Sequence, residues 1–164
     1  KTPMIWRGPM VTSAIKTFTQ QVNWKDLDFI IVDMPPGTGD TQLTFSQGIE
    51  MNGAIIVSTP QEVALLDVKR GIKMFDKLGV KILGLIDNMS SFTGDDGKKY
   101  AIFGEGGVKR TAKEFNKEFL AEIPIDPNVG KFGDQGKPIV ESNPNSKISQ
   151  IYINLAKKIK SIYL

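Results

Sequence analysis

The sequence predicts an α/β fold in which a mostly parallel sheet carries helices on both faces. Two observations lead to this prediction: nearly continuous apolar runs of strand length recur along the chain, and segments with helical spacing lie between them. Continuous apolar runs are typical of strands buried on both faces, because a half-exposed strand alternates apolar and polar residues. Strands that alternate with helices are joined by right-handed crossovers, which place helices on both sides of the sheet.

The expected strands are four apolar runs, the first of which comes only after a helix: Phe29–Val32, Ala54–Val57, Ile82–Ile86 and Phe119–Ala121. Helical spacing precedes the third run through Val63, Leu66, Ile72, Phe75 and Leu78. It precedes the fourth run through Val108, Ala112 and Phe115. We expect the last segment to form an amphipathic helix that packs on one sheet face through Ile148, Ile151, Tyr152, Leu155, Ile159 and Ile162.

The composition is that of a single globular domain of 164 residues, with 40% hydrophobic and 24% charged residues. The net charge of +3 comes from basic and acidic residues scattered along the chain, so we expect no nucleic-acid partner. No apolar run approaches the length of a membrane span, so we expect no membrane partner and a cytoplasmic location. The absence of cysteine and histidine excludes disulfides, catalytic thiols and the usual zinc sites.

The candidate site follows from what comes after each apolar run. Ligands of open parallel sheets bind beyond the carboxyl ends of the strands. The residues at these positions are polar: Asp33 to Asp40, Ser58 to Gln61, Asp87 to Ser90 and Ile123 to Asp126. We therefore expect carboxylates, hydroxyls and an amide to converge on one edge of the sheet.

Asp33 is the candidate metal-associated carboxylate, because an acidic residue that ends a buried strand can hold Mg²⁺ through water in nucleotide triphosphatases. Gly37 and Gly39 give the following loop the freedom to bring its amides to a phosphate and to change conformation on hydrolysis. Asp40 is open to two interpretations, a part of this loop or a cap of the next helix.

The string Val-Asp-Met-Pro-Pro-Gly-Thr-Gly-Asp-Thr-Gln-Leu-Thr at 32–44 resembles the switch II signature of the Mrp/ApbC family. Four further strings match that family in its order: Trp6 to Val11, Thr59 to Asp67, Asn88 to Ser90 and Ile102 to Gly107. The resemblance covers essentially the whole chain. It implies the fold of the MinD-like P-loop ATPases, ATP and Mg²⁺ as cofactors, a homodimer that sandwiches two nucleotides, and delivery of iron–sulfur clusters to apoproteins.

The resemblance also implies roles for single residues. Asp33 would be the Mg²⁺-associated switch II carboxylate, and Gly37 and Gly39 would belong to the loop that senses the γ-phosphate. Asn88 would bind the adenine edge, since its amide offers a donor and an acceptor together. Pro124 and Asp126 would line the base and ribose. The alternative for Asn88 is an Asx turn that closes the strand.

The chain departs from the family in lacking a phosphate-binding loop. The nearest match, Gly130 to Lys137, is followed by Pro138 in place of a Ser or Thr, and we interpret it as a surface turn. We therefore expect residues 1–164 to be one unit, the C-terminal part of a P-loop ATPase domain without its N-terminal P-loop portion. We expect no ATP hydrolysis by this chain alone.

The second departure is the loop from Ser91 to Ala101, where many family members carry a Cys-x-x-Cys. Here the corresponding positions fall near Thr93 and Asp96, which are not the usual ligands of an iron–sulfur cluster. A cluster bound by this chain is therefore doubtful, and we expect the loop to be mobile. Two alternatives to a cluster carrier stay open: a MinD- or ParA-like spatial-organising ATPase, and a non-hydrolysing dimerisation module.

Overall fold

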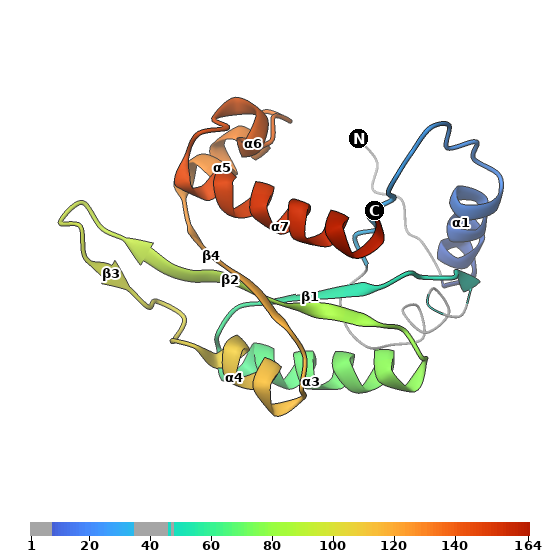
Figure 1. The fold of residues 1–164 in the computed structure, drawn as a ribbon, viewed down its shortest axis with the longest axis horizontal. Coiled ribbons are helices and arrows are strands. Elements are labelled where there is room, and N and C mark those ends of the chain that lie inside the picture. Colours follow the sequence, from blue (N-terminus) through green and yellow to red (C-terminus); the bar gives the residue numbers. More distant parts are fainter. Residues whose placement is uncertain (1–7, 35–45, 47) are drawn as a thin grey trace.

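A computed structural model describes residues 8–34, 46 and 48–164. Its sheet is built on three parallel strands in the order β1, β2, β4, with the short strand β3 antiparallel to the far end of β2 (Figure 1). The strands are β1 (Ala54–Ser58), β2 (Ile82–Thr93), β3 (Lys99–Tyr100) and β4 (Phe119–Ile125). Three of the four predicted strands are thus confirmed, and they pair in parallel as the continuous apolar runs indicate.

One face of the sheet is covered by α3 (Glu62–Lys77) and α4 (Gly107–Glu114). Gly107 lets α4 approach the chain after β1, because a Cβ at this position would lie 2.4 Å from the Pro60 carbonyl oxygen. The core on this face consists of Leu65, Val68, Ile72, Phe75, Ile82, Leu85, Val108 and Ala112. The predicted apolar positions of α4 are therefore confirmed.

The opposite face is covered by α5 (Pro127–Gly133), α6 (Ile139–Ser142) and α7 (Lys147–Tyr163) (Figure 1). The last helix packs on the sheet as its amphipathic spacing predicts. Its N-terminus is capped by the Ser146 hydroxyl, which accepts a hydrogen bond from the Ser149 amide at 3.2 Å. The core on this face consists of Ile86, Ile123, Ile139 and Ile148.

The prediction of a buried strand at Phe29–Val32 is wrong. These residues follow α1 (Gly8–Gln20), adopt no regular structure, and are exposed, with Ile31 at 82%. A strand exists only where its N–H and C=O groups pair with a neighbour. Among the described residues, β1 is hydrogen-bonded on one side to β2 and has no partner strand on its other side. Phe29–Val32 pairs with no strand among the described residues, so its apolar character alone does not make it a strand.

The predicted buried face of α3 is also partly wrong. Ile72 and Phe75 are buried as expected, but Val63 is 71% exposed and Leu66 is 59% exposed. Leu65 and Val68 take the inward positions instead. Both sets have helical spacing, so the sequence does not decide between two adjacent stripes of the same helix.

The segment from Gly130 to Lys137 is wrongly predicted as a surface turn throughout. Its first residues are the end of helix α5, and only the residues after Gly133 form a turn. Asp126 caps this helix: its Oδ1 accepts hydrogen bonds from the Asn128 amide at 2.9 Å and from Asn128 Nδ2 at 3.0 Å.

The segment from Ser91 to Ala101 forms a β-hairpin, and its mobility stays a prediction from its composition. β2 continues past the sheet and pairs with β3 through Phe92–Tyr100 and Thr93–Lys99, so the hairpin projects from the molecule (Figure 1). Asp96 closes its turn by accepting hydrogen bonds from the Lys98 amide at 3.0 Å and from the Tyr100 hydroxyl at 2.9 Å. These bonds replace the missing apolar anchor.

Candidate functional site

Three polar side chains on neighbouring strands form a row across the sheet. Ser58 on β1 pairs in register with Asp87 on β2, and Asp87 pairs with Glu122 on β4. Ser58 and Asp87 are buried, whereas Glu122 is exposed. The pairing of the parallel strands thus places one hydroxyl and two carboxylates side by side, at the end of β1 and within β2 and β4.

Asp87 is the most unusual member of the row. It is only 2% exposed, and its Oδ1 has no hydrogen-bond partner among the described residues. Burial, and to a smaller extent the neighbouring Glu122 charge, together raise the pKa of Asp87 from 3.8 to about 6. A buried carboxylate without a partner is costly, so the site favours either a protonated Asp87 or a bound group that donates to it.

Sequence reasoning missed Asp87. The residue belongs to the polar string Asp87 to Ser90, which the sequence predicts to follow the end of a strand. In the structure, β2 continues through it, so Asp87 lies inside the sheet and is enclosed on both sides by β1 and β4. The sequence feature that could have indicated a buried carboxylate is that Asp87 directly follows the apolar run Ile82–Ile86.

Asn88 lies within β2, next to Asp87 and in register with Ile123 on β4. Its side chain makes no hydrogen bond within the described part of the chain, so the structure does not support an Asx turn. The residue after it, Met89, has a φ of 54°, a left-handed conformation that is strained for a residue with a Cβ. The ladder between β2 and β4 is irregular between Asn88 and Phe92, and β2 passes from the sheet into the hairpin there.

Pro124 and Asp126 lie beside this position. Pro124 follows Ile123 on β4, and Asp126 ends that strand as the cap of α5. The fold thus places Asn88 and Pro124 on neighbouring strands, one residue apart in register, and Asp126 directly after β4. The observed role of the Asp126 carboxylate is to cap α5.

Asp33 is exposed and lies in the irregular segment between α1 and β1. No described strand pairing connects it to Asn88 or Asp87. Gly37 and Gly39 lie outside the described residues, as does Asp40. The predicted base-binding residues thus lie on or directly after neighbouring strands, and the predicted phosphate-binding loop lies outside the described residues.

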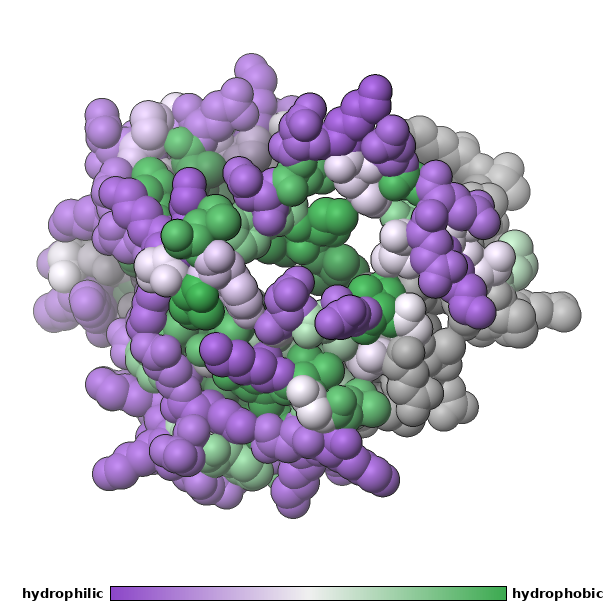
Figure 2. Space-filling view, turned by 45° about the vertical axis from the view of Figure 1, so that its right-hand side comes forward, coloured by the Kyte–Doolittle hydropathy of each residue, from purple (hydrophilic) through white to green (hydrophobic). Residues whose placement is uncertain are grey.

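Part of the exposed surface is hydrophobic. Figure 2 shows hydrophobic side chains in a hollow on one face, surrounded by mostly hydrophilic ones. Among the exposed apolar residues are Ile30, Ile31 and Val32, and Val57 on β1 is 56% exposed. None of the described helices is long and apolar enough to cross a membrane.

The hairpin offers no ligands for an iron–sulfur cluster. The chain contains no cysteine and no histidine, and the Asp96 carboxylate is already engaged within its own turn. The described residues also contain no group of three acidic side chains that could hold a metal ion. A cluster therefore does not fit the donor set of this chain.

A mostly parallel sheet with helices on both faces defines an open α/β protein. Solved structures agree. A nucleotide-binding protein from Archaeoglobus fulgidus in complex with ADP matches with a TM-score of 0.71 and 39% identity, over 78% of this chain and 53% of that one. The cell division ATPase MinD from Pyrococcus furiosus matches with a TM-score of 0.68, over 95% of this chain and 59% of that one, and at 23% identity it shows the fold alone.

The family is defined by sequence. Residues 1–160 match the ParA family model described as NUBPL iron-transfer P-loop NTPase. An iron–sulfur cluster carrier protein from Synechocystis is 48% identical over 159 residues, which is 96% of this chain and 45% of the relative. The chain therefore belongs to the family of NUBPL iron-transfer P-loop NTPases, and it spans about half the length of the curated relatives it matches. This confirms the resemblance and the P-loop NTPase fold class drawn from the sequence.

Proposed function

We propose that the intact protein is an ATPase that carries iron–sulfur clusters and delivers them to apoproteins. The observation that carries this proposal is the family match over residues 1–160, supported by relatives named as iron–sulfur cluster carrier proteins. We further propose that this chain contributes, as one unit, the C-terminal part of the P-loop ATPase domain. A cytoplasmic location remains a prediction from the sequence.

This chain would bind the base of the nucleotide and would supply the loop that changes conformation on hydrolysis. The Asn88 amide would pair with the adenine edge, with Pro124 and Asp126 beside the base and ribose. Asp33 would hold the water shell of Mg²⁺, the ion that neutralises phosphate charge when bound. Gly37 and Gly39 would let the loop after Asp33 follow the γ-phosphate. The uncompensated Asp87 carboxyl supports a site that is completed by a bound group.

The phosphate cradle and the cluster ligands must come from outside these residues. The chain has no Gly-Lys-Ser or Gly-Lys-Thr loop to bind the phosphates, and it has no thiolates for the cluster as cargo. We infer a homodimer of the intact protein that holds two nucleotides between its subunits. Turnover and cluster transfer are therefore properties of the full-length protein and not of this chain alone.

The test is the substitution Asp33→Ala in the full-length protein, with ATP turnover and cluster transfer to an apo-acceptor measured side by side. We expect turnover to be lost while the circular dichroism spectrum is unchanged, because Asp33 is exposed and supports no core contact. Asp134→Ala, at an exposed position after α5, is the matched control and should keep parental turnover. Near-parental turnover in Asp33→Ala would contradict the assignment, and a parent that neither hydrolyses ATP nor transfers clusters would contradict the proposed function.

A further inference from the structure

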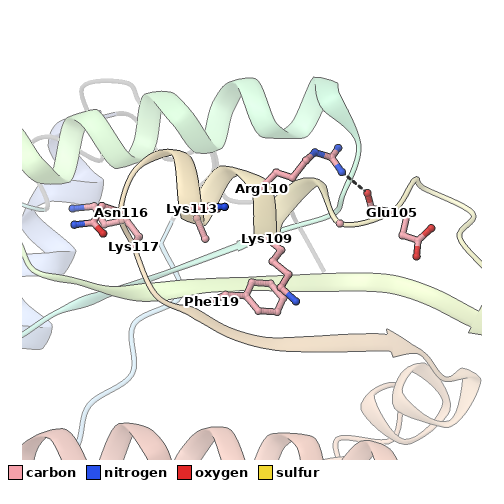
Figure 3. A pocket seen from close by; sticks show the side chains of 9 residues that line it. Glu105, Lys109, Arg110, Lys113, Asn116, Lys117 and Phe119 are labelled. Atoms are coloured by element: carbon pink, nitrogen blue, oxygen red, sulfur yellow. Dashed lines mark hydrogen bonds between the residues drawn. The ribbon is translucent and has the colours of Figure 1, made fainter.

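A groove of about 750 Å³ lies between α4 and the beginning of β4 (Figure 3). It contains none of the residues proposed above for the nucleotide. We call it the α4–β4 groove, and the side chains that define it are Glu105, Lys109, Arg110, Lys113, Lys117 and Phe119. Four cations and one carboxylate give it a strong excess of positive charge.

Two of the four cations are already neutralised. Arg110 Nη1 donates to the Glu105 carbonyl at 2.8 Å, and its Nη2 lies 3.5 Å from Glu62. Lys117 Nζ lies 2.7 Å from Asp76 Oδ1.

Lys109 and Lys113 have no carboxylate within 4.0 Å in the described part of the chain, although they occupy adjacent turns of α4 on one side of the helix. Figure 3 shows Lys109 reaching down from α4 to Phe119, where its ammonium lies 5.8 Å from the ring centroid. The groove therefore offers unpaired positive charge directly above an aromatic floor.

Phe119, the first residue of β4, lines the other side of this groove. Within the described residues, β4 is hydrogen-bonded only to β2, so the backbone groups on its outer edge have no strand partner. An exposed strand edge is a template for another extended chain. Pro124 lacks an N–H and limits such pairing near the end of the strand, which leaves the amino-terminal part, beginning at Phe119, as the available edge.

We propose that the α4–β4 groove binds an extended acidic segment of a partner protein. The segment adds to the free edge of β4 as a strand, so that its alternate side chains point toward α4. There its carboxylates meet Lys109 and Lys113, and an apolar side chain contacts Phe119. A small polyanion would use the lysines but neither the strand edge nor the aromatic floor, so the groove favours a peptide. This proposal does not depend on the nucleotide or cluster function.

The test uses the full-length protein and a short, fluorescently labelled peptide in which Glu and Val alternate, with binding followed by anisotropy. The double substitution Lys109→Glu with Lys113→Glu should weaken binding roughly tenfold or more, since two attractive contacts become repulsive. The control is Lys157→Glu with Lys160→Glu, which makes the same charge change at exposed positions of α7. It should change binding less than twofold, and Lys113→Glu alone should show an intermediate loss.

Strand addition is tested with two further peptides, N-methylated at odd or at even positions. Only one of the two should lose binding, because alternate amides of an added strand face β4. Equal weakening by both double variants, equal binding of both methylated peptides, or tripolyphosphate competing as well as the peptide would each overturn the proposal.

Discussion

The substitution Asp87→Asn should stabilise the protein at neutral pH. The pKa of Asp87 rises from 3.8 to about 6 in the fold, and one unit corresponds to about 1.4 kcal/mol. Ionised Asp87 therefore lowers the free energy of unfolding by at most about 3 kcal/mol. Because the protein around the side chain relaxes, we expect an effect of roughly 1–3 kcal/mol. Asparagine has nearly the same shape and no charge to bury, so it removes this cost.

The raised pKa of Asp87 decides in which direction the free energy of unfolding changes with pH. The folded state holds the Asp87 proton more tightly than the unfolded state, so the contribution of this group is most favourable below its unfolded value of 3.8 and is lost as the pH rises to about 6. The difference in unfolding free energy between Asp87→Asn and the parent should be small near pH 4, grow up to about pH 6, and stay constant above it. Urea unfolding without nucleotide at several pH values measures this difference.

Other titrating groups cancel in that comparison, except for Glu122, whose charge acts directly on Asp87. Asp95→Asn, in the exposed turn of the hairpin, is the control and should show no such rise with pH. A less stable Asp87→Asn protein at about pH 8 would refute the reasoning, because it would mean that a partner of Asp87 stabilises the ionised form. A difference that does not vary with pH would refute it as well.

Two further predictions concern the base site and the core. Asn88→Ala in the full-length protein should weaken ATP binding by about 1–3 kcal/mol, because the adenine edge loses a paired donor and acceptor. Calorimetry measures this affinity, with the exposed Asn145→Ala as control. Equal affinities of Asn88→Ala and the parent would show that Asn88 does not bind the base. Ser149→Ala should lower the free energy of unfolding by about 1–3 kcal/mol, because the fully buried hydroxyl donates to the Asn143 carbonyl at 2.7 Å and lies 3.1 Å from the Ile139 carbonyl. Exposed Ser161→Ala should cost less than about 0.5 kcal/mol in the same denaturant series, and a loss as large as that of Ser149→Ala would show that burial is not the cause.

The local sequence pattern was sufficient to predict those parts of the fold that depend on residues close together in the sequence. The continuous runs at Ala54–Val57 and Ile82–Ile86 predicted parallel strands, and the apolar stripe of the last helix predicted its packing on the sheet. Because parallel strands share a carboxyl edge, the polar residues that follow them could be expected to gather there. The strings at 32–44 and 59–67 were specific enough to indicate the family, which the comparison over residues 1–160 confirms.

Tertiary structure decided whatever depends on partners that are distant in sequence. Phe29–Val32 has the same apolar character as the true strands, yet it pairs with no strand in the described part of the chain, and a strand is made by pairing. The strand pairing and the Asp96 hydrogen bonds that form the hairpin at Ser91–Ala101 are not revealed by composition. The uncompensated charge of Asp87 arises only because β1 and β4 enclose β2 at this position, so burial, and with it the raised pKa, is a property of the assembled sheet.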